Sequence, residues 1–225
     1  MFLFVNYSSG GNRAKHFMKL NADQIMFAIN DTKTLLHIYS LNDEKSRLRG
    51  FRKISRCDGG RIVIAGGDGS VMWVYDHLLK FNIDPMLFPI AIIPFGTGND
   101  LAAFSGWGRK PPRSLIGDYM TALQRHVTLW SIATPIPMDL WMLEVTVKPN
   151  GYFMTVKSDG SEKFTGPLTE SDGNKVITYR RIFQNYMSIG MDARIGLGFE
   201  KKRTKSTFYN KVRYAWEGFK KSCLC

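Results

Sequence analysis

Two glycine-rich turns of the chain contain residue types that suit phosphate chemistry. They read Gly66-Gly67-Asp68-Gly69-Ser70 and Gly96-Thr97-Gly98-Asn99-Asp100. Glycines let backbone N–H groups approach phosphate oxygens, because no side chain stands in the way. The hydroxyl and amide side chains add neutral polar contacts to such oxygens. Together the two turns predict a phosphate-binding crevice.

Each turn also contains a carboxylate, which would repel a phosphate unless it had a task of its own. Asp68 is suited either to meeting a Mg²⁺ ion or to accepting the proton of an attacking hydroxyl. Asp100 is a second candidate for holding a metal ion or a water molecule, and alternatively it is an ordinary acid in the first turn of a helix. Because phosphoryl transfer needs mainly positioning and charge neutralisation, the turns offer the groups that this reaction requires.

A strand is expected before each turn and a helix after it. The apolar runs 61–65 and 90–93 are short and rich in β-branched residues, which is typical of strands buried on both faces. Apolar residues at helical spacing predict a helix over 70–81, and Ser70 near its start could cap the helix or bond a phosphate. A second helix is expected to open at 98–100. This order of strands and helices predicts an α/β domain with a parallel sheet.

A third turn of similar character lies near the start of the chain. It follows the apolar run 2–5 and reads Asn6-Tyr7-Ser8-Ser9-Gly10-Gly11. A strand that leads through such a turn into a helix presents N–H groups and hydroxyls to an anion, with the helix dipole adding attraction. Asn, Ser and Gly are also ordinary turn residues. The third turn therefore gains its significance from the other two.

Several familiar motifs are missing from the sequence. It has neither a Walker A sequence nor a GxGxxG fingerprint with a downstream acid, and its four histidines lack metal-binding spacing. Its three cysteines form no disulfide framework, which favours a reducing, cytoplasmic compartment. No apolar run approaches the roughly 18 residues of a membrane-spanning helix. We therefore expect a soluble protein or one that associates peripherally with membranes.

Positive charge is concentrated in the last third of the chain. The chain has a net charge of +12, and residues 180–221 contain eleven Lys or Arg against three acids, so 11 − 3 gives +8 for this segment. Such a segment implies an anionic partner, which could be nucleotide phosphates, nucleic acid or an acidic lipid surface. The alternative is a solvated basic face that only aids solubility.

The sequence texture changes near residue 128. The segment 1–128 has the strand and helix alternation of an α/β domain, whereas 129–225 has mainly β-type alternation. Within the second part, residues 149–175 are rich in Gly, Ser, Asp and Lys, which predicts an exposed hairpin or a partly mobile insertion. We expect two domains, the second of them β-rich.

The turns and several later segments resemble the diacylglycerol kinases. In the first domain the matching pieces are the turn 6–11, the segment 66–71, the segment 94–102 and Gly106-Trp107-Gly108. Later pieces, at 138–141, 183–192, 196–199 and Asn210-Lys211, resemble the opening of the accessory domain of that family. Gly-Gly-Asp-Gly is shared with NAD kinases and relatives of phosphofructokinase, whereas Gly-Thr-Gly-Asn-Asp is more specific to lipid kinases.

The resemblance implies a phosphofructokinase/NAD-kinase-like domain with a parallel sheet, followed by a β-rich accessory domain, with the active site between them. It implies transfer of the γ-phosphoryl of Mg-ATP to the hydroxyl of diacylglycerol, which gives phosphatidic acid at a membrane surface. The segment 180–221 would then face anionic lipid, and no nucleic-acid partner is expected.

The resemblance also assigns roles to individual residues. The residues expected to line ATP are Asn6, Ser9, Gly66, Gly67, Gly69, Ser70, Gly96, Thr97, Gly98 and Asn99. Asp68 would be the catalytic base or a Mg²⁺ anchor, and Asp100 a further candidate for Mg²⁺. Asp139 would face the lipid head group, or alternatively make a structural hydrogen bond at the domain junction.

The chain departs from the family pattern at several positions, of which Tyr7, Ser70 and Phe95 are tolerable replacements of a usual Pro, Thr and Leu. Ala103 and Leu140 stand where the family has arginines, so two cations are missing. The accessory domain of the family also continues further and supplies a late acidic turn, whereas this chain ends at Cys225. Three alternatives follow: an active lipid kinase, a truncated and inactive module that binds nucleotide or membrane, and a kinase of sphingosine or ceramide.

Overall fold

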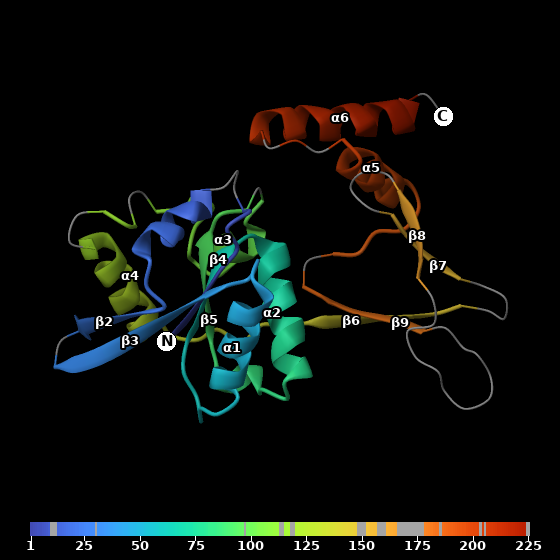
Figure 1. The fold of residues 1–225 in the computed structure, drawn as a ribbon. Coiled ribbons are helices and arrows are strands. Elements are labelled where there is room, and N and C mark those ends of the chain that lie inside the picture. Colours follow the sequence, from blue (N-terminus) through green and yellow to red (C-terminus); the bar gives the residue numbers. More distant parts are fainter. Residues whose placement is uncertain are drawn as a thin grey trace, which may run out of the picture. The chain divides into compact units, whose positions relative to one another are not determined.

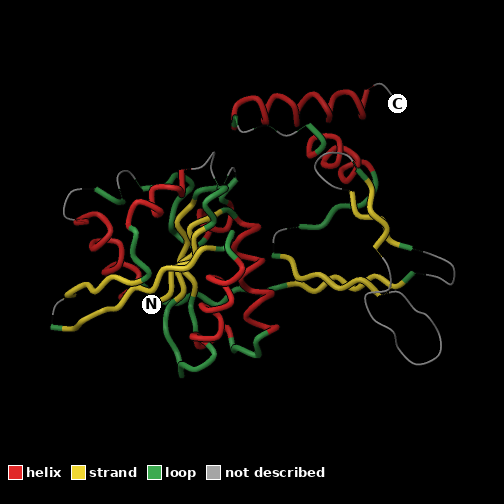
Figure 2. The backbone as a smooth tube through the Cα atoms, viewed as in Figure 1, coloured by secondary structure: helices red, strands yellow, loops and turns green. Residues whose placement is uncertain are grey.

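The chain folds into two compact units, Met1–Met138 and Asp139–Cys225, in a computed structural model. The residues that the structure describes are 1–9, 13–29, 31–96, 98–112, 115–117, 120–147, 152–156, 161–165, 178–184, 186–202, 204 and 206–223 (Figure 2). We describe each unit by itself. Within the described residues, no helix combines the length and the apolar character needed to cross a bilayer.

The first unit is built on one five-stranded sheet (Figure 1). Its strands, in spatial order, are β2 (Gln24–Ile29), β3 (Thr32–Ser40), β1 (Phe2–Val5), β4 (Ile62–Gly66) and β5 (Ile90–Pro94). All neighbouring pairs are parallel except β2 and β3, which form an antiparallel hairpin. The predicted α/β class with a parallel sheet is therefore confirmed.

Helices cover both faces of this sheet, as the continuous apolar strands require. On one face, residues such as Phe4 and Ile64 pack with apolar residues of α1 (Glu44–Ile54) and α2 (Asp68–Lys80). On the other face, residues such as Val5 and Val63 pack with the 3₁₀ helix η1 (Arg13–Leu20) and with α4 (Thr121–Ile132). A short 3₁₀ helix, η2 (Pro85–Leu87), lies between α2 and β5. The result is a three-layer α/β/α arrangement.

The helix after the first glycine turn begins earlier than the sequence predicted. It starts at Asp68, and Gly67 in extended conformation is the N-cap. The helix therefore starts two residues before the expected start at residue 70, and Ser70 does not cap it. The glycine permits an abrupt change from strand to helix, so Ser70 falls within the first helical turn, where it is buried. Asp68 instead has the favourable position of an acid at the positive end of a helix dipole.

The first unit continues past residue 128. Position 128 lies inside α4, whose residues Leu123, Val127 and Trp130 are all buried in the core. Separating the chain there would expose this apolar face. The first compact unit accordingly ends at Met138.

The second unit contains strands, as predicted, and two helices that were not predicted. Strand β6 (Trp141–Thr146) pairs antiparallel with β9 (Thr178–Phe183), and β7 (Phe153–Val156) pairs antiparallel with β8 (Glu162–Thr165). The hairpin of β7 and β8 lies in the expected insertion at 149–175, of which the structure describes residues 152–156 and 161–165. The helices are α5 (Met191–Glu200) and α6 (Thr207–Cys223). Glycines inside α5 and aromatic residues in α6 weaken helix propensity, which is why sequence reading missed both.

Candidate functional site

The three turns that were singled out in the sequence lie at one edge of the sheet. Strand β1 runs parallel to β4, and β4 runs parallel to β5, so their carboxyl ends point the same way. The register places Val5 beside Ala65 and Gly66 beside Pro94, immediately before the turns. The chain goes from β1 to β3 on one side and then crosses to β4 on the other. Such a topological switch point is where open α/β sheets form ligand crevices.

Side chains of the first and third turns meet in this crevice. The Asn6 amide donates to the Ser70 hydroxyl at 3.0 Å, and the Ser8 backbone N–H donates to Asn6 Oδ1 at 3.1 Å. The Ser9 backbone N–H donates to the Asn6 carbonyl at 3.0 Å. Asn6, Ser9 and Ser70 were all predicted to line ATP, and the structure brings them together. Because the Ser70 oxygen accepts here, its proton is left to donate elsewhere.

Asn42 is a member of this network that sequence reasoning missed. It lies in the loop after β3, accepts a hydrogen bond from the Tyr7 N–H at 2.7 Å and donates to the Ser8 hydroxyl at 3.0 Å. The only possible signal was topological, because β3 is also parallel to β1 and its carboxyl end reaches the same edge.

The two glycine turns pack backbone against backbone. A Cβ atom on Gly67 would lie 2.9 Å from Gly96 Cα, and a Cβ on Gly96 would lie 2.6 Å from Gly67 Cα. A Cβ on Gly66 would lie 2.6 Å from the Ser70 side chain. Gly67 and Gly96 are thus required by the close approach of the two turns, and Gly66 by the Ser70 side chain next to it. A Cβ on Gly69, in contrast, would meet no atom within 4 Å.

This contrast predicts opposite effects for two alanine substitutions. Gly67→Ala should lower the free energy of unfolding by about 1–3 kcal/mol, because the methyl group forces the two turns apart. Gly69→Ala should leave stability unchanged or raise it by up to about 1 kcal/mol, since alanine favours a helix more than glycine does. Urea unfolding followed by circular dichroism measures both changes.

Binding of ATP to the Gly69→Ala variant gives the functional part of the same prediction. If the open space beside Gly69 receives a phosphate, this variant should bind ATP more weakly by calorimetry although it is fully folded. Unchanged affinity would show that phosphate binds elsewhere.

Asp68 joins the starts of two helices. Its carboxylate accepts the backbone N–H groups of Asp100 at 3.0 Å and of Leu101 at 3.2 Å, which belong to the first turn of α3 (Asp100–Phe104). The side chain is therefore held in one orientation at the crevice. A carboxylate has about four lone-pair sites, so two accepted hydrogen bonds leave it able to accept a proton or bind a cation.

Asp100 is paired with a cation that sequence reasoning missed. Asp100 Oδ1 lies 2.5 Å from Arg109 Nη1, and the same nitrogen donates to the Gly98 carbonyl at 3.3 Å. Arg109 thereby compensates the negative charge of Asp100 and ties the loop after α3 to the second turn. The second carboxylate oxygen, Oδ2, lies 3.2 Å from the position of a Cβ on Gly98, and Asp68 Oδ2 lies 3.9 Å from it. Both carboxylates thus face the same side of Gly98.

Asn99 lies inside the second turn. It is only 3% exposed and adopts the left-handed conformation with φ of 56°. Its amide nitrogen lies within hydrogen-bond distance of three carbonyl oxygens, those of Pro94 at 3.2 Å, Gly96 at 3.0 Å and Arg109 at 2.9 Å, which share its two N–H groups. Its Oδ1 atom has no partner among the described residues. The side chain therefore organises the turn. Thr97, which was predicted to line ATP, lies outside the described residues.

The remaining predicted site residue belongs to the other unit. Asp139 is exposed and precedes β6 by two residues. Its contact with a lipid head group stays a prediction. The described residues contain no cluster of three or more histidine, cysteine or acidic side chains that could hold a metal ion. Binding of Mg²⁺ at the crevice would therefore depend on Asp68 and Asp100 together with phosphate oxygens, which is the usual way Mg²⁺ is held with a nucleotide.

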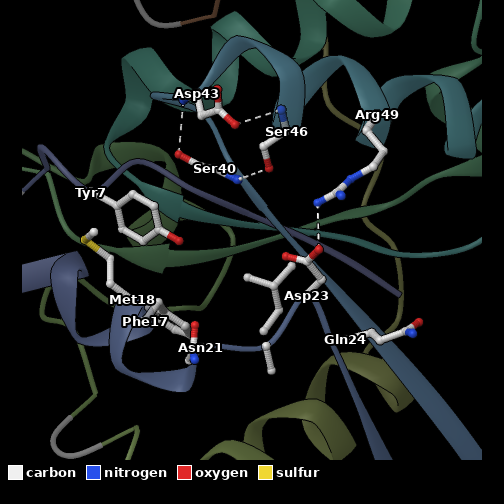
Figure 3. A pocket seen from close by; sticks show the side chains of 12 residues that line it. Tyr7, Phe17, Met18, Asn21, Asp23, Gln24, Ser40, Asp43, Ser46 and Arg49 are labelled. Carbon is white, nitrogen blue, oxygen red and sulfur yellow. Dashed lines mark hydrogen bonds and ion pairs between the residues drawn. The ribbon is translucent and has the colours of Figure 1, made fainter.

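A separate pocket of about 740 Å³ lies beside the end of β3, between η1 and α1 (Figure 3). Figure 3 shows Tyr7 and Met18 on one side of it and the ion pair of Arg49 with Asp23, at 2.9 Å, on the other. Burial raises the pKa of the Tyr7 hydroxyl. None of the described residues of the two glycine turns lines this pocket.

Comparison with known proteins agrees with this geometry. Residues 1–132, more than half of the chain, match the diacylglycerol kinase catalytic domain, and residues 182–225 match the diacylglycerol kinase accessory domain. The parallel sheet of the first unit agrees with the phosphofructokinase/NAD-kinase-like fold that the resemblance implied. No solved structure matches the chain significantly.

Individual relatives are similar over nearly the whole chain. Diacylglycerol kinase 4 of Arabidopsis thaliana is 32% identical over 97% of this chain and 48% of its own length. The putative diacylglycerol kinase K06A1.6 of Caenorhabditis elegans is 32% identical over 97% of this chain and 21% of its own length. Diacylglycerol kinase zeta of Homo sapiens is 28% identical, with the same two coverages. The chain thus spans about half of the plant relative and about a fifth of the other two. It belongs to the diacylglycerol kinase family.

Proposed function

We propose that this protein transfers the γ-phosphoryl of Mg-ATP to the hydroxyl of diacylglycerol and so forms phosphatidic acid. The observation that carries the proposal is the position of Asp68. Its carboxylate is fixed by two backbone N–H groups at the point where the two glycine turns meet. Membership of the diacylglycerol kinase family supports the choice of lipid and reaction.

The groups around Asp68 suit the binding of a polyphosphate. Helix α2 begins at Asp68 and runs for 13 residues, so the positive end of its dipole lies at the crevice. The open space beside Gly69 allows an oxygen to approach the backbone, and the Ser70 hydroxyl can donate to it. Asn6 fixes that hydroxyl, because its amide donates to the Ser70 oxygen.

The reaction forms a bond between the lipid hydroxyl oxygen and the γ-phosphorus and breaks the bond from that phosphorus to the oxygen that leaves with ADP. The hydroxyl proton must be removed, and Asp68 can accept it. Alternatively Asp68 anchors Mg²⁺, which supplies charge neutralisation when it is bound. The convergence of the Asp68 and Asp100 Oδ2 atoms beside Gly98 fits a divalent ion shared with phosphate oxygens.

Two further roles belong to the second unit. Asp139, which is exposed at the start of that unit, is proposed to contact the lipid head group. The basic segment 180–221 is proposed to bring the protein to anionic lipid, so that diacylglycerol is met at a membrane surface.

The direct test is transfer of label from γ-labelled ATP to diacylglycerol dispersed in detergent micelles with Mg²⁺. We expect labelled phosphatidic acid, and we expect sphingosine and ceramide to remain unlabelled in parallel reactions. Preferential labelling of either of those lipids would contradict the proposed substrate. If ATP binds by calorimetry but no lipid is labelled, the chain is a nucleotide-binding module and the proposed transfer is wrong.

A further inference from the structure

Helix α6 of the second unit has its polar and apolar sides reversed relative to an ordinary surface helix. The face that is covered contains Asn210 and Glu217, which are 3% and 4% exposed. The exposed residues include five that are large and apolar or aromatic, with exposed fractions between 52% and 72%: Phe208, Tyr209, Val212, Trp216 and Phe219. A helix that serves only to fold the unit would direct these side chains inward.

The exposed apolar residues form one continuous stripe, which we call the α6 apolar face. Four of them follow the helical spacing of i, i+4, i+8 and i+11: Phe208, Val212, Trp216 and Phe219. With about 100° of rotation per residue, these four side chains lie within roughly 80° of one another around the helix axis. The rings of Trp216 and Phe219 stack, with centroids 6.0 Å apart. Large apolar patches of this kind mark interaction sites.

Polar contacts on the opposite side fix the rotation of the helix. Glu217 pairs with Lys202 at 3.4 Å and with Lys221 at 3.9 Å. The Asn210 amide donates to the Thr204 carbonyl at 2.8 Å, and its Oδ1 atom accepts the Thr204 N–H at 2.8 Å. Turning the helix to bury its apolar face would break the contacts with Lys202 and Thr204, which lie outside α6, and leave Glu217 with Lys221 alone. The exposure of the apolar face is therefore built into the packing of α6 beside α5 (Figure 1).

Basic residues border the α6 apolar face on both sides. By the same rotation, Arg213 and Lys220 flank the stripe on one side and Lys211 on the other. All three are exposed. The single acid of the helix, Glu217, is buried between two lysines and contributes no negative surface. The rim around the apolar stripe is therefore positive.

We propose that the α6 apolar face inserts into the interface of an anionic bilayer, with its basic rim on the lipid phosphates. Helices with an apolar face, interfacial aromatic residues and flanking Lys and Arg lie in the plane of the membrane surface in this way. The positive charge of the rim favours an anionic lipid surface over a second copy of the chain as the partner. A second copy of the chain would bring the same positive rim into contact with itself, whereas an anionic lipid surface complements it.

Vesicle co-sedimentation without ATP tests this inference independently of phosphoryl transfer. The wild-type protein should bind vesicles of phosphatidylcholine with phosphatidylserine, and bind vesicles of phosphatidylcholine alone far more weakly. The double variant Phe208→Ser, Trp216→Ser should reduce binding about tenfold or more, since two large side chains no longer leave water. Met86→Ser is the matched control, because Met86 is an exposed apolar residue of the first unit. This control should bind as the wild type does.

Three results would overturn the inference. The first is a double variant that binds anionic vesicles as well as the wild type, with an unchanged circular dichroism spectrum. The second is binding that is indifferent to lipid charge and to salt. The third is wild-type protein that sediments as a dimer, ignores vesicles and becomes monomeric in the double variant, which would assign the face to a second copy. The micelle assay separates failures: wild-type protein that transfers phosphoryl in micelles but binds no anionic vesicles would reject membrane docking by this segment and leave the proposed phosphoryl transfer standing.

Discussion

Asp68→Ala is expected to lower phosphoryl transfer by roughly a thousandfold, within the range that a general base or a charge-stabilising group contributes. The expected loss of folding free energy is much smaller, about 1 kcal/mol, because the side chain contributes to the fold as an acid in the first turn of α2 and as the acceptor of two N–H groups at the start of α3. The variant should therefore be folded, bind ATP and transfer almost nothing. Rates come from the labelled-ATP assay and stability from urea unfolding.

Asp43 supplies a matched control for the capping role. As the N-cap residue of α1 it accepts two backbone N–H groups, those of Lys45 and Ser46, and Asp68 likewise accepts two N–H groups at the start of α3. Asp43→Ala should lose a similar amount of stability and keep most of its activity. Equal loss of activity in the two variants would mean that capping, and not chemistry at the crevice, explains the effect of Asp68.

The metal dependence of Asp68→Asn separates the two proposed roles of the carboxylate. Asparagine can still accept one of the two N–H groups, but it binds a cation weakly and is no base. If Asp68 anchors Mg²⁺, activity should recover in part as Mg²⁺ is raised or Mn²⁺ is supplied. If Asp68 accepts the proton, added metal should not help. Full activity of Asp68→Asn at ordinary Mg²⁺ would exclude both roles.

Local patterns in the sequence were sufficient to predict the α/β class of the first unit, its parallel sheet and the three turns, since buried strands and glycine turns each have a short signature. What they could not show is why particular glycines are there. Gly67 and Gly96 are far apart in the sequence, and only the parallel register of β4 and β5 brings their backbones into contact. The sequence reading assigned these glycines to phosphate. The structure gives them a packing role and leaves Gly69 beside open space.

Two site residues were not predicted from the sequence for a different reason. Asn42 and Arg109 lie in loops and act on partners brought to them by topology, Tyr7 and Ser8 for one and Asp100 for the other. No local pattern marks such a residue. Arg109 is notable because this chain lacks two arginines of the family pattern, at Ala103 and Leu140. Arg109 is a cation close to the second turn that the sequence analysis did not single out.

In the second unit, by contrast, propensity was misleading. Aromatic and β-branched residues favour strands, yet those of α6 lie on a helix because its polar side is held by Glu217 and Asn210. The aromatic and β-branched residues that lowered the predicted helix propensity of this segment are the ones that form the α6 apolar face. Tertiary contacts decided the structure there, and they also left the apolar residues exposed.

Substitution of Asn99 is expected to have the largest effect on stability. Asn99→Ala removes an amide that serves three carbonyl oxygens and places a residue with a Cβ and no local hydrogen bond in the left-handed region. Buried carbonyls without a donor cost about 1–3 kcal/mol, and the backbone strain adds about 1 kcal/mol. We therefore expect a loss of about 3 kcal/mol in urea unfolding, together with weaker ATP binding.

Two further variants of Asn99 divide this loss into its causes. Asn99→Gly keeps the left-handed conformation and loses the hydrogen bonds, so it should be more stable than Asn99→Ala by about 1 kcal/mol. Asn99→Asp keeps the shape but directs carboxylate oxygen, which cannot donate, at three carbonyls in a buried place. It should be at least as unstable as Asn99→Ala. An Asn99→Asp protein of wild-type stability would show that the hydrogen bonds donated by Asn99 do not hold the second glycine turn. The conformation of that turn would then have to be stabilised by other contacts.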